Sequence, residues 1–135
     1  VRYLNPQPSP VKSHFLKHPA DKIFLCDVVK AELYFGAFKS TRREENLALL
    51  VELGNGFSSL PFEGNAARHF GQIRAELAKA GTPIGPYDLQ IAAIALHHGF
   101  TLVTHNTRGF SRVANLNQQF SLWKVILIQL DKVNV

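Results

Sequence analysis

The stretch Gly85–Asn106 reads GPYDLQIAAIALHHGFTLVTHN, and it indicates the fold. Pro86 at the first helical position and Gly99 just past the last one delimit a predicted helix, because proline fits a helix start and glycine a helix end. The apolar strand Thr101–Thr104 follows at once and runs into a polar loop, His105–Arg108. A helix that leads directly into a short apolar strand is typical of α/β proteins with a parallel sheet.

Helix and strand patterns alternate along the rest of the chain as well. Asp27 is a candidate cap for the second predicted helix, and Thr41 with Glu44 resembles a capping box at the start of the third. Gly54 begins the glycine-rich end of that third helix. We expect the last strand, around Val125–Leu130, at an edge of the sheet, since exposed edges invite pairing. The other predicted helices and strands are helices 10–18, 28–39, 41–53 and 63–80, and strands 22–29, 57–62 and 122–130.

Composition places the chain in a class. Its 135 residues and 46% hydrophobic content suit a single domain with its own core. The lone cysteine, Cys26, rules out a disulfide framework and fits a reducing cytoplasm. Neither a signal peptide nor a membrane span is evident, so we expect a cytoplasmic protein. A net charge of +5 and a pI near 9.6 favour a polyanionic partner such as RNA, DNA or an acidic protein.

Two of the ten acidic residues occupy unusual positions. Glu32 follows a buried strand on a mostly apolar helix, where a carboxylate is costly unless it is paired or bound to a metal. Its structural alternative is a salt bridge to Lys30 or to a nearby arginine. Asp88 is the third residue of its helix, where free N–H groups and the helix dipole favour an ionised carboxylate. Its structural alternative is stabilisation of its own helix. For both Glu32 and Asp88, the structural alternative is favoured when the residue is considered alone.

Other polar residues could complete a site. Thr104 and Asn106 leave the end of a strand, where open parallel sheets bind ligands, although a plain polar turn explains them equally well. Glu76 lies on the long helix and can pair with Lys79 three positions later. Carboxylates with neutral oxygen ligands suit Mg²⁺ or Mn²⁺, and such a cation could activate water for attack on a phosphodiester. The histidines form no zinc pattern, and no phosphate-binding glycine loop is present.

An ordered set of segments resembles the VapC toxins, which are PIN-domain ribonucleases. No single segment is decisive, but the set follows the family's order and spacing over residues 1–113. The matching segments are Val28–Ala37, Arg43–Ala48, Gly71–Leu77, Gly81–Asp88 and Leu102–Val113.

The resemblance implies a fold and an activity. The fold is a PIN-like, RNase-H-like three-layer α/β/α sandwich with a central, mainly parallel sheet, and we take residues 1–135 as one PIN domain. The activity is that of a Mg²⁺-dependent (or Mn²⁺-dependent) endoribonuclease, the toxin of a type II toxin–antitoxin pair. Its implied substrate is tRNA, the initiator tRNA in this subgroup, and its implied partners are a small antitoxin and a second copy of the chain.

The resemblance also assigns residues. Glu32 and Asp88 become metal-site acids, Asn106 takes the place of a fourth acid, and Glu76 is a recurring glutamate near the site. We further expect RNA contacts from Arg74, Arg108, Arg112 and Thr104. For each of the three arginines, a solvated surface position or a structural ion pair is the alternative.

The sequence departs from the family pattern at both ends. VapC toxins begin with a strand that ends in a Leu-Asp-Thr-Asn-like motif, whose aspartate is a metal ligand. Here Val1–Asn5 resembles the helix after that motif, and no aspartate precedes Asp21. We therefore expect the first strand to be missing and catalysis to be weak or absent. Residues 117–135 diverge too. The alternative function is a catalytically inactive PIN-like module that binds RNA or an antitoxin.

Overall fold

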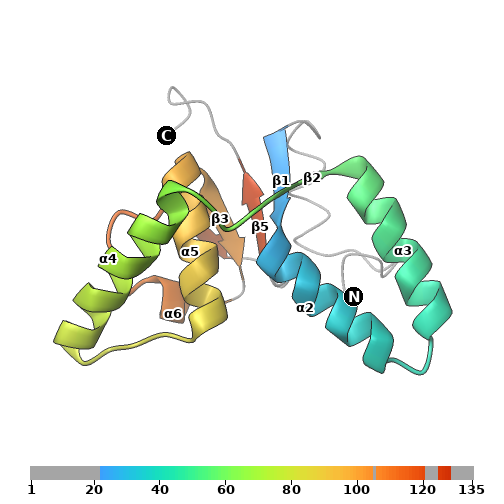
Figure 1. Ribbon diagram of the computed structural model, residues 1–135, viewed down its shortest axis with the longest axis horizontal. Helices are drawn as coiled ribbons and strands as arrows, with labels where there is room; N and C mark the ends of the chain where they lie inside the picture. Colours follow the sequence, from blue (N-terminus) through green and yellow to red (C-terminus); the bar gives the residue numbers. More distant parts are fainter. Residues whose placement is uncertain (1–21, 105, 121–124, 129–135) are drawn as a thin grey trace.

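The computed structural model describes residues 22–104, 106–120 and 125–128 (Figure 1). The helix predicted at residues 10–18 lies outside them, as do His105 and residues 121–124. Strands and helices are interspersed as the sequence predicts, but two helices follow each of the strands β1 and β2, and β4 and β5 are consecutive. The elements are β1 (Ile23–Cys26), α2 (Asp27–Lys39), α3 (Arg43–Gly56), β2 (Ser58–Leu60), α4 (Asn65–Ala80), α5 (Pro86–His98), β3 (Thr101–Thr104), α6 (Thr107–Phe110), β4 (Gln118–Phe120) and β5 (Val125–Ile128).

The five described strands form one sheet in the order β2-β1-β5-β3-β4. β1 pairs with β2, and β3 with β4, in parallel, whereas β5 is antiparallel to both β1 and β3. The α/β class is confirmed, with a mixed sheet. The expected edge position of the last strand is wrong, because β5 lies in the centre. β5 pairs with the inner edges of β1 and β3, so each of these two buried strands has a partner on that edge.

Two helical pairs cover the sheet. In Figure 1, α4 and α5 lie to the left of the central strands and α2 and α3 to the right. α2 also contacts α5, which brings the two pairs together beside the sheet. α5 is buried continuously from Ile91 to Ala95, as expected for a helix that is apolar on several faces. No helix of the described residues has the length and apolar character to cross a membrane.

Local capping differs from the prediction in two places. The N-cap of α3 is Arg42 without a side-chain bond, so the capping box at Thr41 is wrong. Ser40 satisfies this turn instead, because its Oγ accepts from the Arg42 N–H at 2.9 Å and from Asn46 Nδ2 at 3.0 Å. Asp27 is the first residue of α2 rather than its cap, and its carboxylate accepts a hydrogen bond from Ser59 Oγ on β2.

The end of α3 also differs from the prediction, and two elements were not predicted. α3 continues through the glycine-rich segment to Gly56, since backbone bonding persists as far as the Phe57 N–H, which donates to the Leu53 carbonyl. The predicted polar loop after β3 contains the short helix α6, and the divergent tail contributes β4. Both elements are only three or four residues long, which is too short for a period to be visible in the sequence.

Candidate functional site at the carboxyl edge of the sheet

The carboxyl ends of β1 and β3 lie at the same edge of the sheet. Both strands are antiparallel to β5, so they point in the same direction and are separated by β5 alone. α2 begins at this edge because it follows β1 directly. α5 leads into the opposite end of β3, so its first turn lies at this edge too. The topology thus brings the starts of α2 and α5 to one edge, with Asp88 in the first turn of α5 and Glu32 in the second turn of α2.

Asp88 is held by a network that starts at the end of β3. Asn106 Nδ2 donates to Asp88 Oδ2 at 3.1 Å, across 18 positions of sequence. The Asn106 Oδ1 accepts from the Gly109 N–H at 3.2 Å, which makes Asn106 the N-cap of α6. The Asn106 N–H donates to Thr104 Oγ1 at 3.0 Å. The Asn106 amide therefore has a definite orientation, with its donor toward the carboxylate.

The start of α5 suits a negative charge. Its N-cap, Gly85, offers no side-chain cap, and Pro86 occupies the first turn. Asp88, half-buried, is the acid of that turn, where free N–H groups and the helix dipole stabilise an anion. This position suits the structural role considered from the sequence, and the carboxylate also accepts a hydrogen bond from Asn106.

Glu32 is half-buried on α2, beside an inward stripe of Val29, Leu33 and Ala37. Burial raises the pKa of the Cys26 thiol to about 11, and the charges of Asp27 and Glu32 add to this increase. The charge of Glu32 therefore acts on the carboxyl end of β1. Because α2 and α5 contact each other, Glu32 and Asp88 belong to adjacent helices at one edge.

The metal-binding side chains of the described residues are dispersed over the structure. Among these described residues, no three histidine, cysteine or acidic side chains cluster closely enough to hold a metal ion. A site built from Glu32 and Asp88 would thus offer two carboxylates, with water or phosphate oxygens completing the shell. This donor set fits Mg²⁺, which commonly binds one or two carboxylates and keeps several waters.

A pocket of about 290 Å³ opens beside Asp88. It brings together four of the residues selected from the sequence and leaves four outside. Glu32 and the buried Thr104 do not line it, and Arg74 and Glu76 are exposed on α4, where Glu76 accepts from Gln72 Nε2 at 3.2 Å. The lining residues are Pro83, Ile84, Gly85, Asp88, Asn106, Arg108, Gly109 and Arg112.

Sequence reasoning missed the loop that forms one wall of this pocket. The residues Pro83, Ile84 and Gly85 precede α5. The signal that could have found them is their position next to Asp88 in Gly81–Asp88, one of the segments that resemble the VapC toxins. Arg112 also lines the pocket, and its Nη1 donates to the Pro83 carbonyl at 3.0 Å. An arginine that was expected to contact RNA thus has a protein partner.

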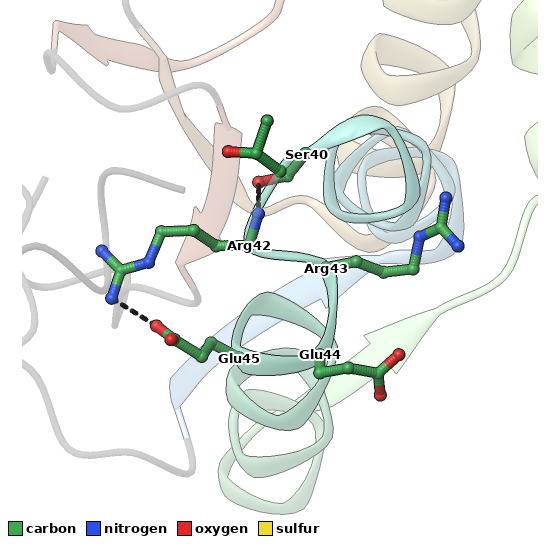
Figure 2. A pocket seen from close by; sticks show the side chains of 6 residues that line it. Ser40, Arg42, Arg43, Glu44 and Glu45 are labelled. Atoms are coloured by element: carbon green, nitrogen blue, oxygen red, sulfur yellow. Dashed lines mark hydrogen bonds and ion pairs between the residues drawn. The ribbon is translucent and has the colours of Figure 1, made fainter.

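A second pocket lies at the turn between α2 and α3, and Figure 2 shows its polar lining. Its groups bond to one another. Arg42 forms an ion pair with Glu45, and the Arg42 N–H donates to Ser40 Oγ. Arg43 Nε donates to the Phe38 carbonyl at 3.1 Å. These contacts explain the turn structurally and suggest no chemistry.

Comparison with known proteins identifies the family. The model of the PIN domain matches residues 1–116, and the chain therefore belongs to the PIN domain family. Its relatives there include VapC proteins. The tRNA(fMet)-specific endonuclease VapC of Shigella flexneri is 40% identical over 113 residues, which is 84% of this chain and 85% of that protein. Ribonuclease VapC2 of Haemophilus influenzae is 38% identical with the same coverage.

Solved structures agree with these relatives. DNA-bound VapBC from Salmonella typhimurium matches with a TM-score of 0.78 at 36% identity, covering 85% of this chain and 86% of that one. VapBC-1 from nontypeable Haemophilus influenzae matches with a TM-score of 0.74 at 31% identity, covering 82% of each chain. The fold and the VapC resemblance inferred from the sequence are thereby confirmed.

Proposed function

We propose that this chain is a metal-dependent endoribonuclease that cleaves tRNA and acts as the toxin of a type II toxin–antitoxin pair. The observation that carries the proposal is the oriented Asp88–Asn106 pair at the carboxyl end of β3. The names of the relatives support the activity, because the Shigella flexneri protein is a tRNA(fMet)-specific endonuclease. The matching solved structures are VapBC proteins, which supports a small antitoxin as partner.

In this proposal Glu32 and Asp88 hold Mg²⁺ or Mn²⁺, and Asn106 orients Asp88. When bound, the cation supplies Lewis acidity at the phosphodiester and makes an attacking hydroxide accessible near neutral pH. Arg108 on the pocket rim contacts RNA phosphate, and the exposed Arg74 extends the basic surface. Glu76, near the end of α4 that leads into the Pro83 loop, assists from outside the pocket.

The second candidate is a PIN-like module that binds RNA or an antitoxin without cleaving. One observation favours it: among the described residues, no cluster of three metal-binding side chains exists. Mg²⁺ loses its hydration reluctantly, so a site with few carboxylates has low occupancy. Small misplacements of an attacking water also cost rate.

The test is cleavage of purified initiator tRNA by the full chain, with Mg²⁺, with Mn²⁺ and with EDTA. An elongator tRNA serves as the substrate control. Asp88→Asn and Glu32→Gln keep the shape of each side chain and remove its charge, so both should abolish any metal-dependent cleavage. Metal-dependent cleavage that survives both Asp88→Asn and Glu32→Gln would refute these carboxylates as the metal ligands. Tight tRNA binding without cleavage in either metal would establish the binding module instead.

The partners need separate tests. We propose that a small antitoxin encoded with this chain binds it and that the chain forms a homodimer. Light scattering of the purified chain, alone and with the candidate antitoxin, measures both. A strictly monomeric chain would refute the homodimer, and the absence of a complex would refute the antitoxin.

A further inference from the structure

The segment that follows β3 is fixed to the core. Phe110 at the end of α6 is 1% exposed, and Val113 three residues later is 5% exposed. Thr104, from which the segment starts, is buried as well. Short backbone bonds tie the turn together, including Ser111 N–H to the Thr107 carbonyl at 2.8 Å. Polar side chains between these anchors therefore project from a well-defined position.

Two side chains of this segment reach the start of α5. The first is Asn106, which donates to the Asp88 carboxylate. The second is Arg112, whose Nη1 donates to the Pro83 carbonyl at 3.0 Å, across 29 positions of sequence. The two bonds hold α5 on both sides of its N-cap, Gly85: one on the loop before it and one in the first turn after it.

The loop before α5 is also attached through Ile84, which packs against the hydrophobic core, and through the Gly85 carbonyl, which accepts from the Leu89 N–H at 3.0 Å. Pro83 has no N–H, so its carbonyl is its only backbone hydrogen-bonding group. Pro86 likewise lacks an N–H, and Gly85 has no side chain to cap the helix. Pro86 begins α5 and Asp88 is two residues later, so a shift of the loop moves the carboxylate as well.

We propose that Arg112 is a positioning residue for Asp88: its bond to Pro83 fixes where α5 begins, and with Asn106 it sets the place of the carboxylate. This inference rests on the proposed function of Asp88 as a metal ligand. It replaces the RNA-phosphate contact that the sequence suggested for Arg112. Arg108 lines the same pocket. It differs from Arg112 because no hydrogen bond of its side chain is found within the described residues.

The experiment compares three arginine-to-alanine variants of the full chain. Arg112→Ala removes the proposed tie, and Arg108→Ala removes a rim charge without that tie. Arg68→Ala, on the exposed surface near the start of α4 and outside the pocket, is the charge-matched control. Three quantities are measured: Mn²⁺ binding by calorimetry, amide hydrogen exchange over residues 84–89, and the salt dependence of tRNA binding.

For Arg112→Ala we expect Mn²⁺ affinity to fall about 10-fold, as is common when a residue supporting a metal ligand is removed. Amide exchange over residues 84–89 should accelerate, and the slope of log affinity against log salt should stay unchanged. For Arg108→Ala we expect the reverse: unchanged exchange and Mn²⁺ affinity, with a salt slope smaller by about 1. Arg68→Ala should change neither exchange nor Mn²⁺ binding.

The positioning role is overturned if Arg112→Ala reduces the salt slope as Arg108→Ala does while exchange and Mn²⁺ binding stay at wild-type values. It is also overturned if Arg68→Ala produces the same exchange and metal effects, because these would then follow from lost charge. Failure of the proposed function looks different. In that case Asp88→Asn would bind Mn²⁺ with the same affinity as the wild-type chain. The hydrogen-exchange comparison, by contrast, reports on the Arg112–Pro83 bond alone.

Discussion

Asn106 offers the sharpest test of the site, because one amide performs two tasks. Asn106→Ala removes the cap of α6 and the bond to Asp88 together. Loss of an N-cap side chain costs about 1 kcal/mol. Loss of a hydrogen bond to a charged group costs about 1.5 kcal/mol, at the lower end of the range because the pair is only partly buried. The free energy of unfolding should therefore fall by about 2.5 kcal/mol, which for a domain of this size lowers Tm by roughly 10 °C.

Asn106→Asp separates the two tasks. An aspartate keeps an oxygen to accept from the Gly109 N–H, so the cap of α6 survives. It replaces the Nδ2 donor with a second carboxylate oxygen next to Asp88, and two like charges at that distance repel each other. Without metal this variant should be less stable than wild type at neutral pH. With Mn²⁺ it should gain more stability than wild type, because it adds a third carboxylate to the site.

The assay is thermal denaturation with and without Mn²⁺, with chemical denaturation as a check on the free energies. The reasoning is refuted if Asn106→Ala unfolds with the wild-type free energy, since the amide would then hold nothing. It is refuted equally if Asn106→Asp shows no larger Mn²⁺ stabilisation than wild type, since Asp88 and residue 106 would then not face a common cation.

Three further predictions concern other parts of the described chain. The Cys26 thiol, whose pKa burial raises to about 11, should resist alkylation in the folded state at about pH 8 and react on unfolding. Because the unfolded thiol ionises first, stability should fall above about pH 9 in denaturant titrations, and Cys26→Ala should remove this dependence; an equally alkaline-labile variant would contradict it. Partial burial of the His98 ring, followed by the neighbouring charge of His97, lowers the pKa of His98, so the folded state prefers the neutral ring. Stability should therefore decline as pH falls below about 6.5, the unfolded value, and His98→Gln should flatten this decline in denaturation midpoints; an unchanged pH profile would count against it. Finally, Thr101 and Ile128 are directly opposite in the antiparallel ladder, so cysteines at both positions in a Cys26→Ser background should form a disulfide within one chain. A pair shifted along the strand, Thr101→Cys with Ile126→Cys, is the matched control, and equal cross-linking of both pairs would disprove the register.

Much of the fold is predictable because its signals are local. Pro86 and Gly99 delimit α5 and lie directly at its two ends in the sequence. The burial of β3 follows from its own apolar residues. The partner of Asp88 is different. Asn106 is visible in the sequence only as a polar residue after a strand, and its bond to Asp88 depends on how α5 packs beside β3. The protein partner of Arg112 is hidden for the same reason, because a basic residue in a polar segment fits an RNA contact equally well.

The place of β5 depends on the whole sheet, and it explains the composition of the candidate site. Apolar residues at 125–128 predict a strand, but they do not say which strands will flank it or in which direction it will run. A parallel strand between β1 and β3 would end at the carboxyl edge and could present a polar side chain there. β5 runs the other way, so Val125, its first residue, lies opposite Thr104 at that edge. Among the described elements, the carboxylates at this edge therefore come from the helices α2 and α5 rather than from the central strand. This arrangement accounts for a candidate site in which the proposed metal ligands, Glu32 and Asp88, both come from helices and, within the described residues, no three metal-binding side chains cluster.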